Sequence, residues 1–233
     1  MSYLFSKRTL VQYFEQQKIN LQAEVENSDP NYLLRVSESD FQEYLVSRYG
    51  LETPRLFGDQ IYQHEPKDAD ISIKRDDPRF ISMGPNAWLK PSHTKIRGTA
   101  ITISIPFEGN AELFKYQPST FTDIPPQGKI VNQEIQLMYQ LIRPDVEELT
   151  RRYSQDLGKI KKYLSWVARD VAAFNQSLPQ FAQDLITRRK QKLLEDRNMS
   201  AALGIPIKRR EDAPRTYAVP SVRRKPMAER PKV

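Results

Sequence analysis

The chain has 233 residues, with 36 Lys and Arg against 29 Asp and Glu, and its formal net charge is +7. It contains no cysteine and only two histidines, His64 and His93. This composition excludes disulfides, thiolate zinc sites, iron–sulfur clusters, cysteine nucleophiles and a histidine-rich metal centre.

The first fifty residues carry two helix patterns and one strand pattern. Apolar residues at helical spacing predict a short helix within residues 6–26. Alternation over residues 32–36, after an Asp-Pro-Asn turn signal, predicts a strand. A serine cap, an acidic first turn and a glycine stop predict a helix over residues 37–50.

Two long strands are predicted between residues 99 and 143. Apolar and polar residues alternate over 99–107 and again over 133–143, a pattern typical of antiparallel sheets with one buried face. Shorter strands are predicted at 56–62 and 113–117. We therefore expect residues 1–143 to form an α+β domain with a mainly antiparallel sheet, and not the parallel sheet of a nucleotide-binding fold.

At Pro144 the apolar period changes to that of a helix. The pattern persists for about eight turns, is interrupted over residues 175–179, and resumes up to Gly204. Residues 144–203 are thus predicted to form an antiparallel helical hairpin. Its apolar stripe either packs in the core or binds a protein partner or a second copy; the candidate partner-binding residues are Leu149, Tyr153, Leu157, Ile160, Leu164 and Val167.

Residues 204–233 are predicted to be a flexible basic tail. The segment holds nine basic and three acidic side chains, so it carries +6 of the net charge of +7, and it is rich in proline. Its basic clusters can bind nucleic-acid phosphates, or serve only as a solubilising linker. The candidate nucleic-acid-binding residues are Lys208, Arg209, Arg210, Arg223, Arg224 and Lys225. The basic run at 188–192 allows the same alternatives, a phosphate contact or a solvated helix face.

No established catalytic motif is present in the sequence. It lacks the phosphate-binding loops, the dinucleotide fingerprint, the zinc-protease and calcium-loop patterns, and the nucleophile elbow. Asp123 and the pair Glu134 and Gln136 loosely resemble the metal-binding carboxylates of a nuclease, but the lysine is missing and a solvated strand face explains them equally well. We predict no catalytic residue, metal or cofactor, and expect both histidines to be ordinary surface or loop residues.

Membrane insertion and export are not indicated by the sequence. No apolar run approaches the roughly 20 residues that span a bilayer, and the N-terminus lacks the features of a signal peptide. A soluble cytoplasmic protein is the expectation.

Several stretches resemble a group of uncharacterised bacterial proteins. They are Ile105-Pro-Phe-Glu-Gly, Glu112-Leu-Phe-Lys, Pro118-Ser-Thr-Phe-Thr, Ile160-Lys-Lys-Tyr-Leu-Ser-Trp166, Phe174-Asn-Gln-Ser-Leu178 and the segment from Leu203 to Tyr217. In that group, a region similar to this one precedes a Pro- and Arg-rich linker and a restriction-endonuclease-like domain of the PD-(D/E)XK class. The resemblance implies a setting in DNA metabolism or defence.

The nuclease-like domain of that group would lie beyond Val233, so no catalytic residue is carried over to this chain. The sequence therefore favours a non-catalytic scaffold or regulatory interaction module, associated with a nuclease-like effector. A nucleic-acid-binding module that uses the basic tail and a cryptic Mg²⁺-dependent nuclease are the alternatives.

Overall fold

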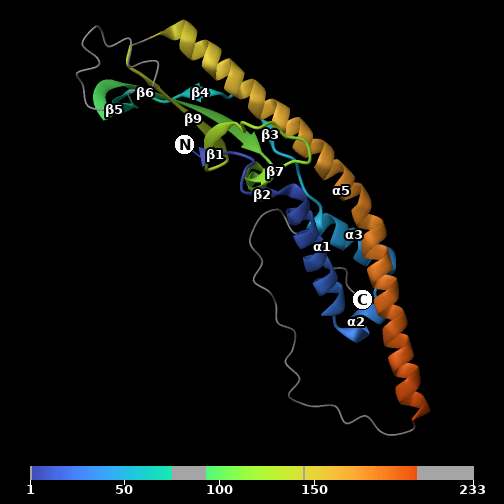
Figure 1. The fold of residues 1–233 in the computed structure, drawn as a ribbon. Coiled ribbons are helices and arrows are strands. Elements are labelled where there is room, and N and C mark those ends of the chain that lie inside the picture. The colour runs from blue at the N-terminus through green and yellow to red at the C-terminus, as the bar shows by residue number, and fades with distance from the viewer. Residues whose placement is uncertain (1, 75–92, 144, 204–233) are drawn as a thin grey trace. The chain divides into compact units, whose positions relative to one another are not determined.

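The computed structural model describes residues 2–74, 93–143 and 145–203 (Figure 1). The chain divides into two compact units. The first contains Met1–Thr9 and Thr53–Val167, and the second contains Leu10–Glu52 and the chain from Ala168 onward. This division differs from the predicted boundary at residue 143, because the N-terminal helices group with the later part of the last helix.

The first unit is built on an antiparallel sheet whose centre is one long strand, β6. The strands are β1 (Ser2–Tyr3), β3 (Arg55–Leu56), β4 (Tyr62–Gln63), β5 (Lys67–Lys74), β6 (His93–Glu108), β8 (Gln127–Val131) and β9 (Glu134–Leu141). The order is β1-β8-β9-β6-β3, and β4 and β5 also pair with β6. All of these pairings are antiparallel. The predicted α+β class with an antiparallel sheet is confirmed, as are both long strands.

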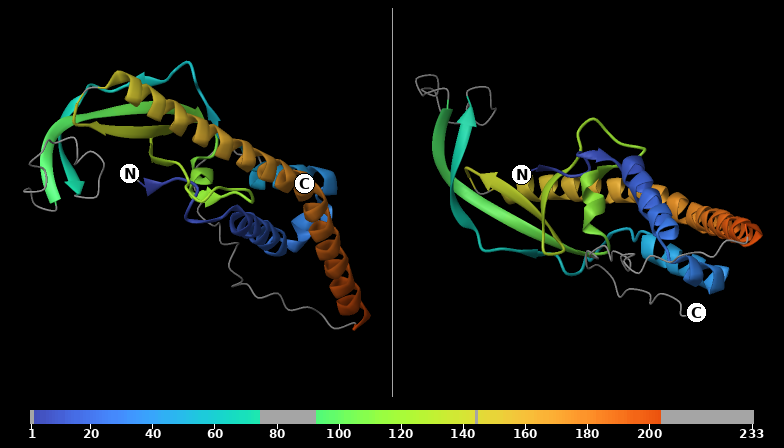
Figure 2. Two further views of the ribbon diagram at one scale, coloured as in Figure 1. Left: turned by 45° about the horizontal axis from the view of Figure 1, so that its top comes forward. Right: turned by 90° about the horizontal axis from the view of Figure 1, so that it is seen from below.

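β9 and β5 pair with β6 over equal lengths, but at positions that are offset along the strand. β9 pairs with residues 99–106 of β6, whereas β5 pairs with residues 93–100. β5 and the start of β6 therefore extend past β9 as a two-stranded ribbon (Figure 2). Gly98 lies where the ribbon leaves the sheet, and a Cβ there would approach Ile71 Cδ1 to 2.4 Å and the Leu141 carbonyl oxygen to 2.5 Å. Only glycine, which has no Cβ, permits this close approach of neighbouring strands.

Short elements complete the first unit. Asn132 and Gln133 have φ angles of 47° and 63°, and a two-residue loop with both φ angles positive is the type I′ turn that suits a β-hairpin. β2 (Arg8–Thr9) pairs in parallel with β7 (Tyr116–Gln117). The strand predicted at 113–117 is wrong for its first part, because Ala111–Lys115 forms a 3₁₀ helix capped by the Asn110 side chain.

Aromatic rings fill the core of the first unit. The Phe5 ring lies 5.4 Å from that of Phe114 and 5.2 Å from that of Tyr163, and Phe107 packs edge-on against Phe114. Phe5, Phe114 and Tyr163 are fully buried. Tyr163 belongs to the last helix, so this cluster fixes the first part of that helix to the sheet.

The second unit consists of helices. They are α1 (Leu10–Glu26), α2 (Pro30–Arg35), α3 (Glu38–Tyr49) and the later part of α5 (Val146–Ala202). The predicted helices at 6–26 and 37–50 are confirmed, the latter with Ser37 as its N-cap. The strand predicted at 32–36 is wrong: Asp29 accepts a hydrogen bond from Tyr32 N, Pro30 occupies the first turn, and the segment is helical. A cap followed by proline starts a helix as readily as it makes a turn.

The predicted helical hairpin is wrong, because α5 is a single helix of 57 residues that passes through Pro179. Proline removes one backbone hydrogen bond from a helix interior. Two side chains of the second unit form hydrogen bonds in this part of α5. Gln42 Nε2 donates to the Pro179 carbonyl at 2.8 Å, and the Asn175 amide bonds both the N–H and the C=O of Leu51 at 2.9 Å. In the segment that resembled a turn, the Asn175 side chain contacts the segment after α3, and the Pro179 carbonyl contacts α3.

Candidate functional site

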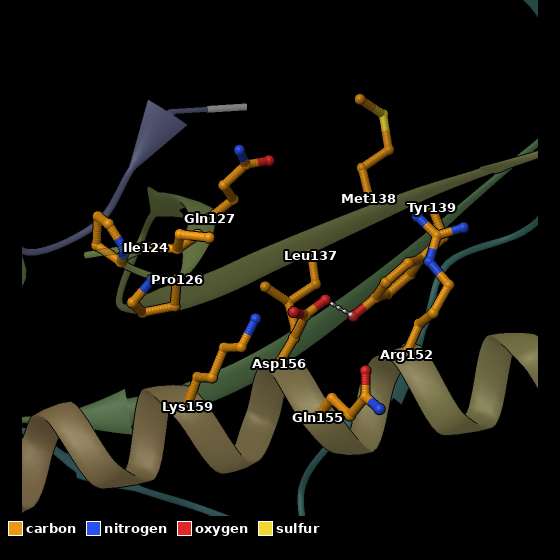
Figure 3. Close-up of a pocket in the computed structure, with 11 residues that line it drawn as sticks. Ile124, Pro126, Gln127, Leu137, Met138, Tyr139, Arg152, Gln155, Asp156 and Lys159 are labelled. Carbon is orange, nitrogen blue, oxygen red and sulfur yellow. Dashed lines mark hydrogen bonds between the residues drawn. The ribbon is translucent and has the colours of Figure 1, made fainter. Parts of the chain in front are cut away.

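A pocket of about 300 Å³ lies within the first unit (Figure 3). Its floor is formed by β9, where Leu137 and Tyr139 face the helix. One end is bounded by the loop before β8, residues 124–127, and the wall opposite β9 is the first part of α5. The pocket thus combines a largely apolar floor with the polar face of a helix.

The loop that borders the pocket is fixed by a buried tyrosine. The Tyr163 hydroxyl accepts a hydrogen bond from Thr122 N at 3.0 Å and donates to the Thr122 carbonyl at 2.9 Å. Phe121 and Ile124 of the same loop remain 52% and 67% exposed. The tether holds the loop in place while Phe121 and Ile124 stay largely exposed, Ile124 at the edge of the pocket.

The wall on α5 presents three charged residues in sequence. Arg152, Asp156 and Lys159 are spaced i, i+4 and i+7, so they share one face of the helix. In Figure 3 all three side chains extend toward β9, with Asp156 between the two cations. The pocket therefore carries the charges plus, minus, plus along its length.

The central carboxylate of this wall is engaged with the sheet. Tyr139 donates its hydroxyl proton to Asp156 Oδ2 at 3.0 Å. Burial, followed by the negative charge of Asp156, raises the pKa of the Tyr139 phenol, so the hydroxyl remains a donor at neutral pH. The Arg152 guanidinium lies 5.6 Å from the centroid of the Tyr139 ring and 3.9 Å from Glu148 Oε1.

The second cation is less engaged. Lys159 is exposed, and no hydrogen bond or ion pair joins its ammonium group to any other part of the chain that the structure describes. Sequence reasoning did not single out Arg152, Asp156 or Lys159. The i, i+4, i+7 spacing is visible in the sequence, but the sheet that turns this face into a pocket wall is not.

A serine–histidine pair lies elsewhere on the sheet. His64 Nε2 and Ser104 Oγ are 2.8 Å apart, and the Tyr62 ring lies 5.1 Å from the His64 ring. Ser104 has 0% exposure, so its hydroxyl is closed to a substrate carbonyl. The pair satisfies a buried polar group on β6. His64 lies in the loop between β4 and β5, in keeping with the predicted surface or loop position, but it is half-buried and hydrogen-bonded.

The carboxylates of the nuclease alternative have separate surroundings. Glu134 Oε1 accepts a hydrogen bond from the Tyr62 hydroxyl at 2.8 Å, while Asp123 is exposed in the loop before β8. Within residues 2–74, 93–143 and 145–203, no group of three or more acidic, histidine or cysteine side chains is arranged to hold a metal ion.

The predicted partner-binding residues fall into two groups. Ile160, Leu164 and Val167 are 0%, 6% and 0% exposed, so they are core residues of this chain. Leu149, Tyr153 and Leu157 are only partly covered, and Val146, one turn before Leu149, is 75% exposed. The stripe is therefore accessible only toward the start of α5.

The basic run at 188–192 is not a uniformly solvated helix face. The Lys190 ammonium is 3.4 Å from Glu38 Oε1 and donates to the Val36 carbonyl at 2.9 Å. Arg189 Nε is buried and has no hydrogen-bond partner among the described residues. Arg188 and Lys192 are exposed, so Lys190 is the basic residue of this run that contacts Glu38 of α3 and the carbonyl after α2. The predicted nucleic-acid-binding residues 208–210 and 223–225 lie outside the described residues.

The second unit holds one dense cluster of titratable groups. Glu24 accepts hydrogen bonds from Tyr44 at 3.0 Å and from Tyr49 at 2.7 Å, and its carboxylate lies 3.2 Å from Arg48 Nε. Burial and the adjacent Glu24 raise the pKa of Tyr49. These polar groups bond to one another, so the cluster joins α1 to α3 and offers no group to a substrate.

Comparisons of the chain with protein-family models, with curated proteins and with solved structures gave no match. No helix of the described residues is both long enough and apolar enough to cross a membrane.

Proposed function

We propose that the chain is a non-catalytic scaffold module that self-associates through the first turns of α5. The observation that carries the proposal is the accessible end of the apolar stripe. Val146, Leu149 and Tyr153 follow the same i, i+3, i+7 spacing as Ile160, Tyr163 and Val167. The later three are buried against the sheet, whereas the first three are exposed or half-exposed.

A second copy is the occupant that this surface favours. Apolar residues at heptad spacing pair with an identical stripe, because each side chain inserts between neighbours of the same kind on the facing helix. A two-fold axis then buries the same patch on both copies. The accessible stripe covers only about two turns, so we expect association in the micromolar range.

The setting of this scaffold is part of the same proposal. The stretches that resemble the proteins with a PD-(D/E)XK nuclease-like domain support an association with a nuclease-like effector. In that setting the module described here would bring effector copies together, and the chemistry would belong to the effector.

Light scattering on the full chain across micromolar concentrations tests the proposal. The expected result is a concentration-dependent dimer, which Val146→Glu and Leu149→Glu convert to a monomer because each places a charge in the paired stripe. Val11→Glu is the matched control, since Val11 is an exposed apolar residue of α1. A wild-type chain that stays monomeric, or a Val11→Glu variant that dissociates as completely as Val146→Glu, would contradict the proposal.

A further inference from the structure

The pocket beside β9 has the size of a small-ligand site. Its volume of about 300 Å³ corresponds to about ten water molecules at roughly 30 Å³ each. That is the lower end of the range for ligand pockets. A ligand that fills it is a short chain or a single ring.

The charges of the wall set the chemistry of such a ligand. Two cations flank one carboxylate, so the wall carries a net positive charge. Asp156 opposes negative charge at the middle of the pocket, and one of its oxygens is already occupied by Tyr139. Negative charge is therefore favoured at the two ends and disfavoured between them.

The distance between the cations sets the length of the ligand. Arg152 and Lys159 are seven residues apart, which is about 10 Å along a helix that rises 1.5 Å per residue. The floor between them is formed by Leu137 and the Tyr139 ring of β9, and the Tyr139 hydroxyl is already bonded to Asp156. A neutral, unbranched middle matches this floor.

From this pattern we propose that the pocket binds a short linear organic dianion, with one acidic group at Arg152 and the other at Lys159. Arg152 is already 3.9 Å from the exposed Glu148 carboxylate, so the ligand competes with Glu148 at that end. At the other end Lys159 has no competing acidic partner among the described residues. The two contacts are of the charge-assisted kind, which is stronger than a neutral hydrogen bond.

Titration of the full chain with three simple acids, followed by ligand-observed NMR at low ionic strength, tests the length and the charge. Octanedioate is expected to bind at least tenfold more tightly than octanoate, which lacks one acidic group, and than pentanedioate, which is too short to reach both cations. Equal affinity for octanoate and octanedioate would overturn the proposal, as would the absence of binding by octanedioate.

Two pocket variants and one matched control test the location. Lys159→Gln and Arg152→Gln are each expected to weaken octanedioate binding about tenfold. Lys161→Gln removes the same charge from an exposed position of the same helix outside the pocket, and it is expected to stay within twofold of the wild type. Equal losses in Lys161→Gln and Lys159→Gln would show a general charge effect and would refute the site. Circular dichroism confirms that each variant is folded.

The source of the dianion is distinguished by one further probe. An acetylated and amidated Glu-Ala-Ala-Glu peptide presents two carboxylates on an extended chain. If this peptide binds more tightly than octanedioate does, the site is assigned to a peptide segment. If it binds more weakly, the site is assigned to a free diacid. A peptide that binds Lys159→Gln as well as the wild type would contradict both. Val146→Glu leaves the pocket unchanged, so it is expected to abolish self-association while octanedioate binding persists, which separates the two proposals.

Discussion

Replacing Asn175 by alanine tests why α5 continues through its polar, proline-containing segment. The Asn175 side chain accepts a hydrogen bond from Leu51 N and donates one to Leu51 O, both at 2.9 Å. Leu51 is 9% exposed, so water replaces these bonds poorly once the amide is removed. Asn175→Ala is expected to destabilise the second unit.

The magnitude follows from the two bonds and the change in helix propensity. Each hydrogen bond contributes about 1 kcal/mol net, and leaving a buried polar group unsatisfied costs about 1–3 kcal/mol. Alanine recovers up to about 0.7 kcal/mol through its higher helix propensity. The expected loss in the free energy of unfolding is therefore about 2 kcal/mol, a large part of the roughly 5–15 kcal/mol that stabilises a typical domain.

Urea unfolding followed by far-ultraviolet circular dichroism measures this loss, and hydrogen exchange at the Leu51 amide reports the site directly. Gln176→Ala is the control, because it removes a neighbouring exposed amide from the same helix. Faster exchange at Leu51 is expected only in Asn175→Ala. Should Asn175→Ala unfold within about 0.5 kcal/mol of the wild type, with unchanged exchange at Leu51, the bracing role of this side chain would be refuted.

Three further predictions concern the sheet, the tyrosine cluster and the tail. Gly98→Ala is expected to lose about 1–3 kcal/mol of stability, because its Cβ would collide with Ile71 and with the backbone at Leu141. Gly158→Ala has open space around its Cβ and should gain about 1 kcal/mol from helix propensity. Calorimetry that shows the same sign of stability change for both variants would contradict this. Because the pKa of Tyr49 is raised in the folded chain, the unfolded chain loses this proton first as the pH rises through 10. The free energy of unfolding should therefore fall above that pH by less than about 1.4 kcal/mol per pH unit, the limit for one group. Tyr49→Phe should make this fall less steep, and an unchanged dependence of stability on pH would refute the role of Tyr49. Deleting residues 204–233 should weaken nucleic-acid binding and reduce its salt dependence in filter-binding measurements, whereas a full chain with no binding at low salt would exclude that function.

The candidate sites divide according to how much of their geometry is local. The apolar stripe of α5 was predictable, because helical spacing alone places its residues on one face, but which part of it is accessible was not, since Ile160, Leu164 and Val167 are buried. The pocket was not predictable, because its floor comes from β9 and its end from the loop before β8. The burial of Ser104 against His64 was equally hidden, since alternation along β6 places Ser104 on the face expected to be exposed.

Sequence by itself determined the elements whose signals are local. The alternation in β6 and β9, the Ser37 cap of α3 and the apolar period of α5 each depend on residues a few positions apart, and each was confirmed. Tertiary structure alone decided that the polar segment at 175–179 does not end a helix, because the residues that contact it, Gln42 and Leu51, are distant in sequence. The segment at 32–36 is helical because of a local cap, Asp29 with Pro30, whose sequence is compatible with a turn as well as with a helix start. A local pattern indicates which structures a segment can form. The groups that the tertiary fold places beside the segment determine which of these structures has the lower free energy.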